Sequence, residues 1–152
     1  MKYCVLTPFF PHPNSYRGTY LLDQAKAIKS QTNAKLKVII LSSFYRPLHS
    51  NYTIEGIDCL SFKLIDFPSF MFPGFFNKIN TKRFKRFLQK NNIVISSETT
   101  VHGHINYPSN FLLTFLKKSF NAKTILQHHA LDILQYDTGT KIPFLKAIQN
   151  YF

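Results

Sequence analysis

Groups that could do chemistry stand where short apolar runs of this sequence end. Val101-His-Gly-His104 precedes a proline-containing turn, and Thr124-Ile-Leu-Gln-His-His-Ala-Leu-Asp132 carries two histidines and an aspartate beyond a strand-like run. An earlier apolar run, 3–6, leads into a polar loop that holds Arg17-Gly18. Ligands of open parallel sheets bind outside the carboxyl ends of the strands. We therefore expect the three loops to share one rim.

The histidines could hold a metal ion, because imidazole and carboxylate groups are common metal ligands. A metal-dependent hydrolase built on His102, His104, His129 and Asp132 is therefore one alternative. Neighbouring residues of a strand point to opposite faces, so His128 and His129 cannot both face one ion while the strand continues. No carboxylate cluster accompanies them. We expect no metal here.

A histidine that binds or deprotonates a hydroxyl group fits the near-neutral pKa of imidazole better. Asp132 follows His129 by three residues and can orient it or cap the next helix. Gly18 at the start of a helix can aim backbone N–H groups at a phosphate or carboxylate, and Arg17 adds guanidinium donors. The alternatives are a buried structural histidine and an ordinary glycine turn.

The elements that position these groups alternate between strands and helices. We predict strands at 3–6, 36–41, 57–64, 99–101 and 123–127, and helices at 19–30, 77–91, 110–118 and from Pro143 onward. The strand at 57–64 is expected nearer an edge, and 66–76 is predicted to be an aromatic loop. No internal boundary is visible, so residues 1–152 are predicted to form one α/β domain. It has an open, mostly parallel, Rossmann-like sheet with helices on both faces.

Composition limits the class of protein. With 152 residues and 45% hydrophobic content, the chain can bury a core of its own. Lys and Arg number 19 against 7 Asp and Glu, so the surface attracts anions such as nucleic acid, anionic lipid or phosphorylated small molecules. Cys4 and Cys59 lie in apolar runs and are predicted to be buried free thiols. The chain shows no signal peptide and no apolar run long enough to span a membrane, so we expect a cytoplasmic location.

A basic stripe marks the predicted helix at 77–91. Its members recur every four residues on the side opposite the apolar one: Lys78, Lys82, Arg86 and Lys90. Together with the aromatic segment before it, the stripe predicts contact with an anionic membrane. The alternative is a solvated helix above a small aromatic core. Nucleic acid is not expected because no RNA-binding sheet motif or helix-turn-helix pattern appears, and without a P-loop or complete G-x-G-x-x-G neither ATP nor nicotinamide is expected.

Five segments, in this order, resemble the N-terminal domain of GT-B glycosyltransferases of family 4. They are Val5-Leu-Thr-Pro-Phe-Phe-Pro-His-Pro13, Arg17-Gly-Thr-Tyr-Leu-Leu-Asp-Gln-Ala-Lys-Ala-Ile28, Glu55-Gly-Ile57, His102-Gly-His104 and Gln127-His-His-Ala-Leu-Asp132. The resemblance covers nearly the whole chain. It implies one of two facing Rossmann-like domains, of which this one holds the acceptor and the other the nucleotide sugar. It also implies metal-independent retaining transfer, often at the cytoplasmic membrane face.

The resemblance also assigns residues of the N-terminal loop and the fourth strand. Gly18 matches the small residue of the loop that faces the donor diphosphate. Arg17 stands where many members have a second glycine. His104 resembles the histidine that follows the fourth strand. These three residues are therefore expected to bind substrate.

The catalytic residues that the resemblance implies are His129 and Asp132. His129 resembles the histidine beside the acceptor hydroxyl and the sugar, and Asp132 the aspartate three residues later. Ala130 replaces the usual glycine between them. His128, directly before His129, is expected to bind substrate.

The family's donor half carries a glutamate pair spaced by seven residues and a basic residue that neutralises the leaving diphosphate, and 1–152 contains no counterpart. Transfer needs that electrostatic stabilisation. We therefore expect a chain that is inactive alone, either a truncated product or one half of a split enzyme, whose donor-binding domain is absent.

The expected function is the acceptor-binding half of a nucleotide-sugar-dependent glycosyltransferase for surface polysaccharide or glycolipid assembly. The sugar nucleotide is its donor substrate, the acceptor is a sugar or lipid-linked sugar, and no cofactor is expected. It would lie on the inner face of the plasma membrane. The alternative is a basic α/β module that docks on anionic membrane or nucleic acid without catalysis.

Overall fold

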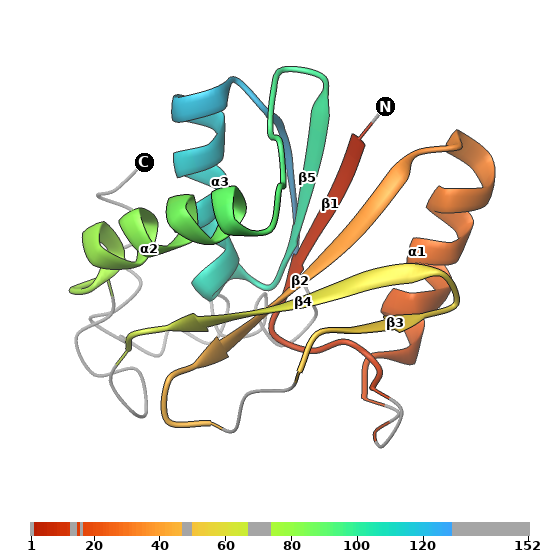
Figure 1. Cartoon of the computed structure of the whole chain (residues 1–152), viewed down its shortest axis with the longest axis horizontal. Helices are drawn as coiled ribbons and strands as arrows, with labels where there is room; N and C mark the ends of the chain where they lie inside the picture. Colours follow the sequence, from red (N-terminus) through yellow and green to blue (C-terminus); the bar gives the residue numbers. More distant parts are fainter. Residues whose placement is uncertain (1, 13–14, 16, 47–49, 67–73, 129–152) are drawn as a thin grey trace, which may run out of the picture.

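A six-stranded sheet forms the middle layer of the computed structural model, which describes residues 2–12, 15, 17–46, 50–66 and 74–128 (Figure 1). The strands lie in the order β3-β4-β2-β1-β5-β6. Every neighbouring pair is parallel except β3 and β4. The strands are β1 (Lys2–Thr7), β2 (Lys35–Ser43), β3 (Tyr52–Ile54), β4 (Ile57–Leu64), β5 (Thr99–His104) and β6 (Lys123–Gln127). The predicted open, mostly parallel sheet is confirmed.

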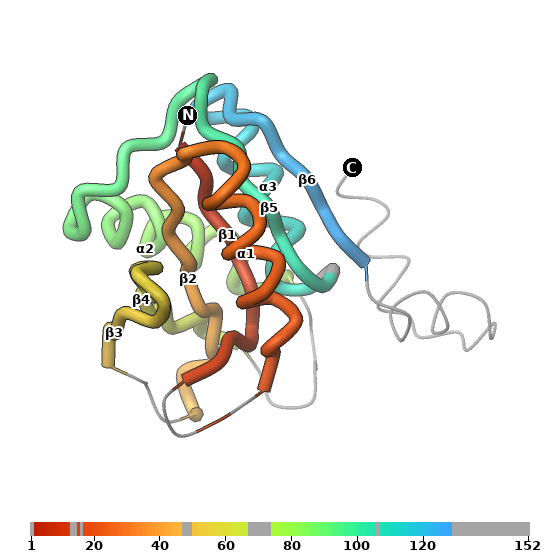
Figure 2. Tube along the Cα trace, turned by 90° about the vertical axis from the view of Figure 1, so that its right-hand side faces the viewer, coloured from red at the N-terminus to blue at the C-terminus, as the bar shows by residue number. Residues whose placement is uncertain are grey.

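Helices cover both faces of the sheet, as the sequence predicts. Figure 2 shows α1 (Thr19–Thr32) in front of the sheet, with α2 (Asn77–Lys90) and α3 (Asn106–Phe120) behind it. Alternate residues of each strand point to opposite faces. Val5 therefore packs in the core under α1, whereas Leu6 packs in the core under α2 and α3. A fully buried leucine of this kind stabilises the fold by roughly 1.5–3 kcal/mol.

Several element boundaries differ from the prediction. The strand predicted at 99–101 continues through His104, because β5 pairs with β1 on one side and with β6 on the other over that length. The helix predicted at 110–118 begins earlier, at Asn106. Of the predicted aromatic loop, 67–73 lie outside the described residues, as does the helix predicted from Pro143 onward.

The short strand β3 has no counterpart in the sequence prediction. It pairs with β4 across a tight turn in which Glu55 and Gly56 both adopt positive φ, at 50° and 65°. That geometry belongs to the turns that suit the twist of a two-residue hairpin. β3 is therefore the edge strand, and β4 lies one place inside it.

The connections diverge between β1 and β5. From β1 the chain crosses through α1 to β2 on one side, whereas β5 lies on the other side of β1. This is the switch point at which open α/β sheets bind ligands, beyond the carboxyl ends of their strands. Because β1, β5 and β6 are parallel, their carboxyl ends lie along one edge of the sheet. The strand ends therefore share one edge, which we call the carboxyl edge, whereas the predicted loop beyond His128 lies outside the described residues.

Gly103 allows α3 to lie close to β5. A Cβ atom built on Gly103 would lie 2.8 Å from Leu113 Cδ1 and 2.9 Å from Ser109 Cβ. We expect Gly103→Ala to lower the free energy of unfolding by about 1–3 kcal/mol through overpacking, as measured by urea denaturation. The exposed residue just before β5 gives a control, Glu98→Ala, which should stay within about 0.5 kcal/mol of wild type. A Gly103→Ala protein as stable as that control would contradict the close packing.

Candidate functional site

His102 and His104 share the α1 face of β5, two residues apart. Their ring centroids lie 4.3 Å apart, and both side chains are buried. The Nδ1 atom of His102 lies 3.0 Å from the hydroxyl oxygen of Tyr3. A buried histidine hydrogen-bonded in this way positions neighbouring strands, so His102 fits the structural alternative.

His104 stands at the carboxyl end of β5, at the switch point. It is only 2% exposed, and the next backbone N–H, that of Ile105, donates to the carbonyl oxygen of Gln127 at 3.1 Å. Gln24 of α1 donates to the side-chain oxygen of Gln127 at 3.2 Å. Those contacts tie β5, β6 and α1 together beside His104. The imidazole is thus buried at the carboxyl edge, and His104 belongs to the strand and not to the loop that follows it.

Gly18 begins α1, as the sequence predicts. It adopts a left-handed conformation with φ 88°, and its carbonyl oxygen accepts from the N–H of Leu21 at 2.9 Å. A Cβ atom at Gly18 would lie 3.3 to 3.4 Å from the segment that follows β1, at Phe9 and Phe10. The first turn of this fully described helix has no acidic residue and no side-chain cap. Its N–H groups and positive dipole end therefore favour an anion.

Arg17 adds a positive charge beside that helix start. Its guanidinium carbon lies 5.4 Å from the centroid of the Phe9 ring. Such a contact is worth about 0.5–1 kcal/mol at an exposed site. It holds the charge over the loop that follows β1.

The predicted residues beyond β6 are placed only in part. His128 is the first residue after β6 and is exposed. His129 and Asp132 lie outside the described residues. Among the residues that are described, no group of three or more His, Cys, Asp or Glu could hold a metal ion.

Neither cysteine is a candidate nucleophile. Cys4 and Cys59 are free and buried, as the sequence predicts. Burial raises the pKa of each thiol to about 12. Because the thiolate is the reactive form, both thiols are inert in the folded protein.

A second polar cluster lies at the same edge, and sequence reasoning missed it. Ser43 Oγ donates to Asp66 Oδ2 at 2.6 Å, joining the ends of β2 and β4. Asp66 Oδ1 is buried and has no hydrogen-bond partner in the described part of the chain. Burial raises the pKa of Asp66, against smaller opposing effects of Ser43 and Arg46. Burial also raises the pKa of Tyr107 to about 12, with further contributions from Asp66 and Tyr45.

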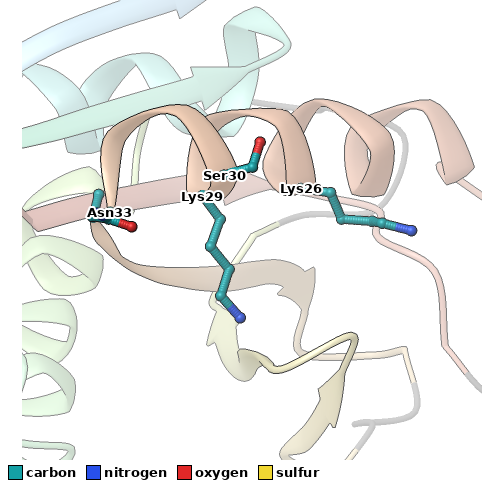
Figure 3. A pocket seen from close by; sticks show the side chains of 5 residues that line it. Lys26, Lys29, Ser30 and Asn33 are labelled. Carbon is teal, nitrogen blue, oxygen red and sulfur yellow. The ribbon is translucent and has the colours of Figure 1, made fainter.

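Two hollows on the described surface lie away from this edge. One of about 400 Å³ lies along the C-terminal half of α1 and is lined by Lys26, Lys29, Ser30, Asn33 and Ala34 (Figure 3). Lys29 Nζ donates to the carbonyl oxygen of Gly56 at 2.7 Å. The other, of about 240 Å³, lies at the amino ends of β1 and β2 and includes Lys2, Lys35 and Lys37.

Comparison with known proteins shows a distant likeness in structure. No family model matches the chain, and no curated protein matches it. Among solved structures, the chain is similar to one from E. coli described as trehalose-6-phosphate bound with UDP-2-fluoro glucose. The identity is 16% and the TM-score 0.47, over 83% of this chain and 32% of that one. The chain thus spans about a third of the length of that structure's chain.

The ionised carboxylate of Asp66 should destabilise the folded protein at neutral pH. Its pKa is raised above 3.8 by burial, so the folded state holds the proton more tightly than the unfolded state. The stabilisation that the proton provides is present below pH 3.8 and is lost as pH rises through the folded-state pKa. Asp66→Asn is therefore expected to raise the melting temperature at pH 7 but to give a smaller gain near pH 3.

The matched control is Asp58→Asn, on the strand β4 that precedes Asp66. That carboxylate is exposed and lies 3.8 Å from Lys37 Nζ, so its removal should cost about 0–1 kcal/mol. An Asp66→Asn protein less stable than wild type at pH 7 would show that the carboxylate stabilises the fold instead.

Proposed function

We propose that this chain is the acceptor-binding half of a nucleotide-sugar-dependent glycosyltransferase. The observation that carries the proposal is the convergence of Gly18, His104 and His128 on the carboxyl edge, around the switch point between β1 and β5. A ligand at that edge meets a helix start suited to an anion and a strand end that carries a histidine. The order of the motifs, which resembles that of family 4 of the GT-B enzymes, supplies the substrate class.

The proposed roles follow from the chemistry of each group. In sugar transfer the acceptor oxygen bonds to the anomeric carbon and loses its proton, while the bond between that carbon and the diphosphate breaks. Arg17 and the start of α1 attract the negative charge of that diphosphate. His129, oriented by Asp132, binds the acceptor hydroxyl and can take its proton. His104, buried at the end of β5, supports the strand end beneath them, and His128 contacts the acceptor.

A partner must complete this site. A second Rossmann-like domain, joined to this chain or supplied by another, binds the nucleotide sugar. The donor is a substrate, and the proposed reaction uses no metal. The acceptor is a sugar or lipid-linked sugar of a surface polysaccharide or glycolipid, made at the cytoplasmic face of the membrane.

The test is acceptor binding by the chain itself. Fluorescently labelled protein is applied to an array of immobilised oligosaccharides and lipid-linked sugars. We expect retention on a chemically related subset, and His129→Ala should weaken it about tenfold by removing one hydrogen bond to a hydroxyl. The control Lys26→Ala, on the exposed side of α1, should bind as wild type. Acceptor binding that is equally strong in His129→Ala and wild type would contradict the role given to His129.

A second candidate function, docking on an anionic membrane, is favoured by α2. The basic residues of this helix are all exposed: Lys78, Lys82, Arg83, Lys85, Arg86 and Lys90. The ion pairs found among the described residues lie on other elements. Ile79 and Phe75, 48% and 71% exposed, add apolar groups beside the basic face. Basic and aromatic groups together suit the interface of an anionic bilayer.

The opposite side of α2 forms the small aromatic core that the sequence offered as the alternative. Phe84 is fully buried, and its ring centroid lies 5.0 Å from that of Phe62. Packing and an exposed basic face therefore occur on one helix. None of the helices among the described residues combines the length and the apolar character that a membrane span needs.

Vesicle sedimentation distinguishes the membrane function. We expect binding to phosphatidylcholine vesicles that contain phosphatidylglycerol and little binding to phosphatidylcholine alone. Each basic residue near such a surface contributes about 1 kcal/mol, so Lys82→Glu with Arg86→Glu should weaken binding at least about tenfold. The control pair Lys26→Glu and Lys123→Glu changes the net charge equally on other elements. Equal losses for both pairs would mean that overall charge, and not α2, controls binding.

A further inference from the structure

Hydrogen bonds to the preceding residue, Ile65, and to the carboxylate itself hold Asp66 in place. The side chain of Asn80, which is fully buried in α2, accepts from the N–H of Ile65 at 2.9 Å and donates to the carbonyl oxygen of Ile65 at 2.8 Å. Ser43 then fixes Asp66 Oδ2 at 2.6 Å. The carboxylate is thus preorganised at the carboxyl edge, where β2 and β4 lie side by side (Figure 1).

The second oxygen of Asp66, Oδ1, is buried and has no hydrogen-bond donor among the described residues. A buried carboxylate oxygen without a donor is unfavourable, so a hydrogen-bond donor from a ligand is favoured there. The positive charge of Arg46 already acts on this carboxylate, which disfavours a second cation. A neutral donor, such as a hydroxyl group, therefore fits this oxygen.

Two exposed aromatic rings follow Ser43 directly. Phe44 and Tyr45 are 51% and 46% exposed, and their ring centroids lie 5.6 Å apart. Their turn is fixed, because the N–H of Phe44 donates to the carbonyl oxygen of Leu64 at 2.8 Å and that of Arg46 to Ser43 at 3.1 Å. Rigid aromatic rings offer apolar contact area next to polar groups that set orientation. A sugar ring has that combination, with an apolar C–H face and hydroxyls at its rim.

We propose that Ser43, Tyr45 and Asp66 form a carbohydrate subsite at the ends of β2 and β4, in which Asp66 Oδ1 accepts from a sugar hydroxyl and Tyr45 packs against the ring. This inference rests on the proposed function, because it assigns the subsite to a further sugar unit of the acceptor. His104 lies on the other face of the sheet, so the acceptor would span the carboxyl edge from one face to the other.

The experiment titrates the ¹⁵N-labelled chain with methyl glycosides of glucose, galactose, mannose and N-acetylglucosamine and follows its amide NMR signals. At least one glycoside should shift the signals of Phe44, Tyr45 and Asp66. Asp66→Ala and Tyr45→Ala should each weaken the binding of that glycoside at least about tenfold. Tyr45→Phe keeps the ring and should weaken binding by less than about threefold. The control Asp58→Ala, at the other end of β4, should bind as wild type. Asp66→Asn gives a second variant if Asp66→Ala does not fold.

Three outcomes would overturn the subsite. One is the failure of every glycoside to shift these three signals. Another is a shift of amide signals that is confined to Gly18 or His128 and is the same in Asp66→Ala. That result would leave the proposed acceptor function intact. The third is displacement of the glycoside by tetramethylammonium, which would identify a cation site. Conversely, glycoside binding at Asp66 without sugar transfer in the presence of a donor-binding domain would support the subsite while contradicting the proposed function.

Discussion

Parallel pairing of β1 with both β2 and β5 is the constraint on which the rest of the structure depends. β1 lies at the centre of the sheet, and its register with β2 aligns Thr7 with Ile40 while its register with β5 aligns Leu6 with Gly103. A slip of one residue would move Val5 and Leu6 to the wrong faces and break both cores. The same pairing brings the carboxyl ends of β2, β1 and β5 to one edge, which is where the candidate groups lie.

The two faces of the sheet support different chemistry at that edge. Under α1, Tyr3, His102 and His104 form a buried polar layer between strands, and Gln24 links the helix to β6. On the face of α2 and α3, the start of α2 supplies Asn80, which clamps the backbone just before Asp66. Each face therefore fixes functional groups through buried hydrogen bonds, a rigid support that binding sites require.

Most of the fold was predictable because buried strands in this chain are nearly continuous apolar runs. β5 was predicted too short because its last residues, His102 and His104, are polar and resemble a loop. Their spacing of two, with one buried face, is nevertheless what a strand produces. β3 escaped prediction since it has only three residues, and the signal that could have found it is the turn at Glu55-Gly56.

The carboxyl edge could be predicted from the sequence, whereas the polar cluster around Asp66 could not. Gly18 and His104 follow strands whose ends the sequence already marks, whereas Ser43, Asp66 and Tyr107 meet only through the register of β2 with β4 and the start of α3. No spacing along the chain encodes that meeting. The polar residues that end β2 and follow β4 were the available signal. The roles of His129 and Asp132 stay predictions.

Sugar transfer tests the central claim most directly. The chain is combined with a donor-binding domain, carried by the same polypeptide or by another, and radiolabelled nucleotide sugars are offered with a lipid extract from the same cells. The proposed function predicts a labelled lipid or oligosaccharide when both parts are present and no labelled product from this chain alone. His129→Ala should greatly reduce the amount of labelled product. No labelled product with any nucleotide sugar, from two parts shown to associate, would contradict it.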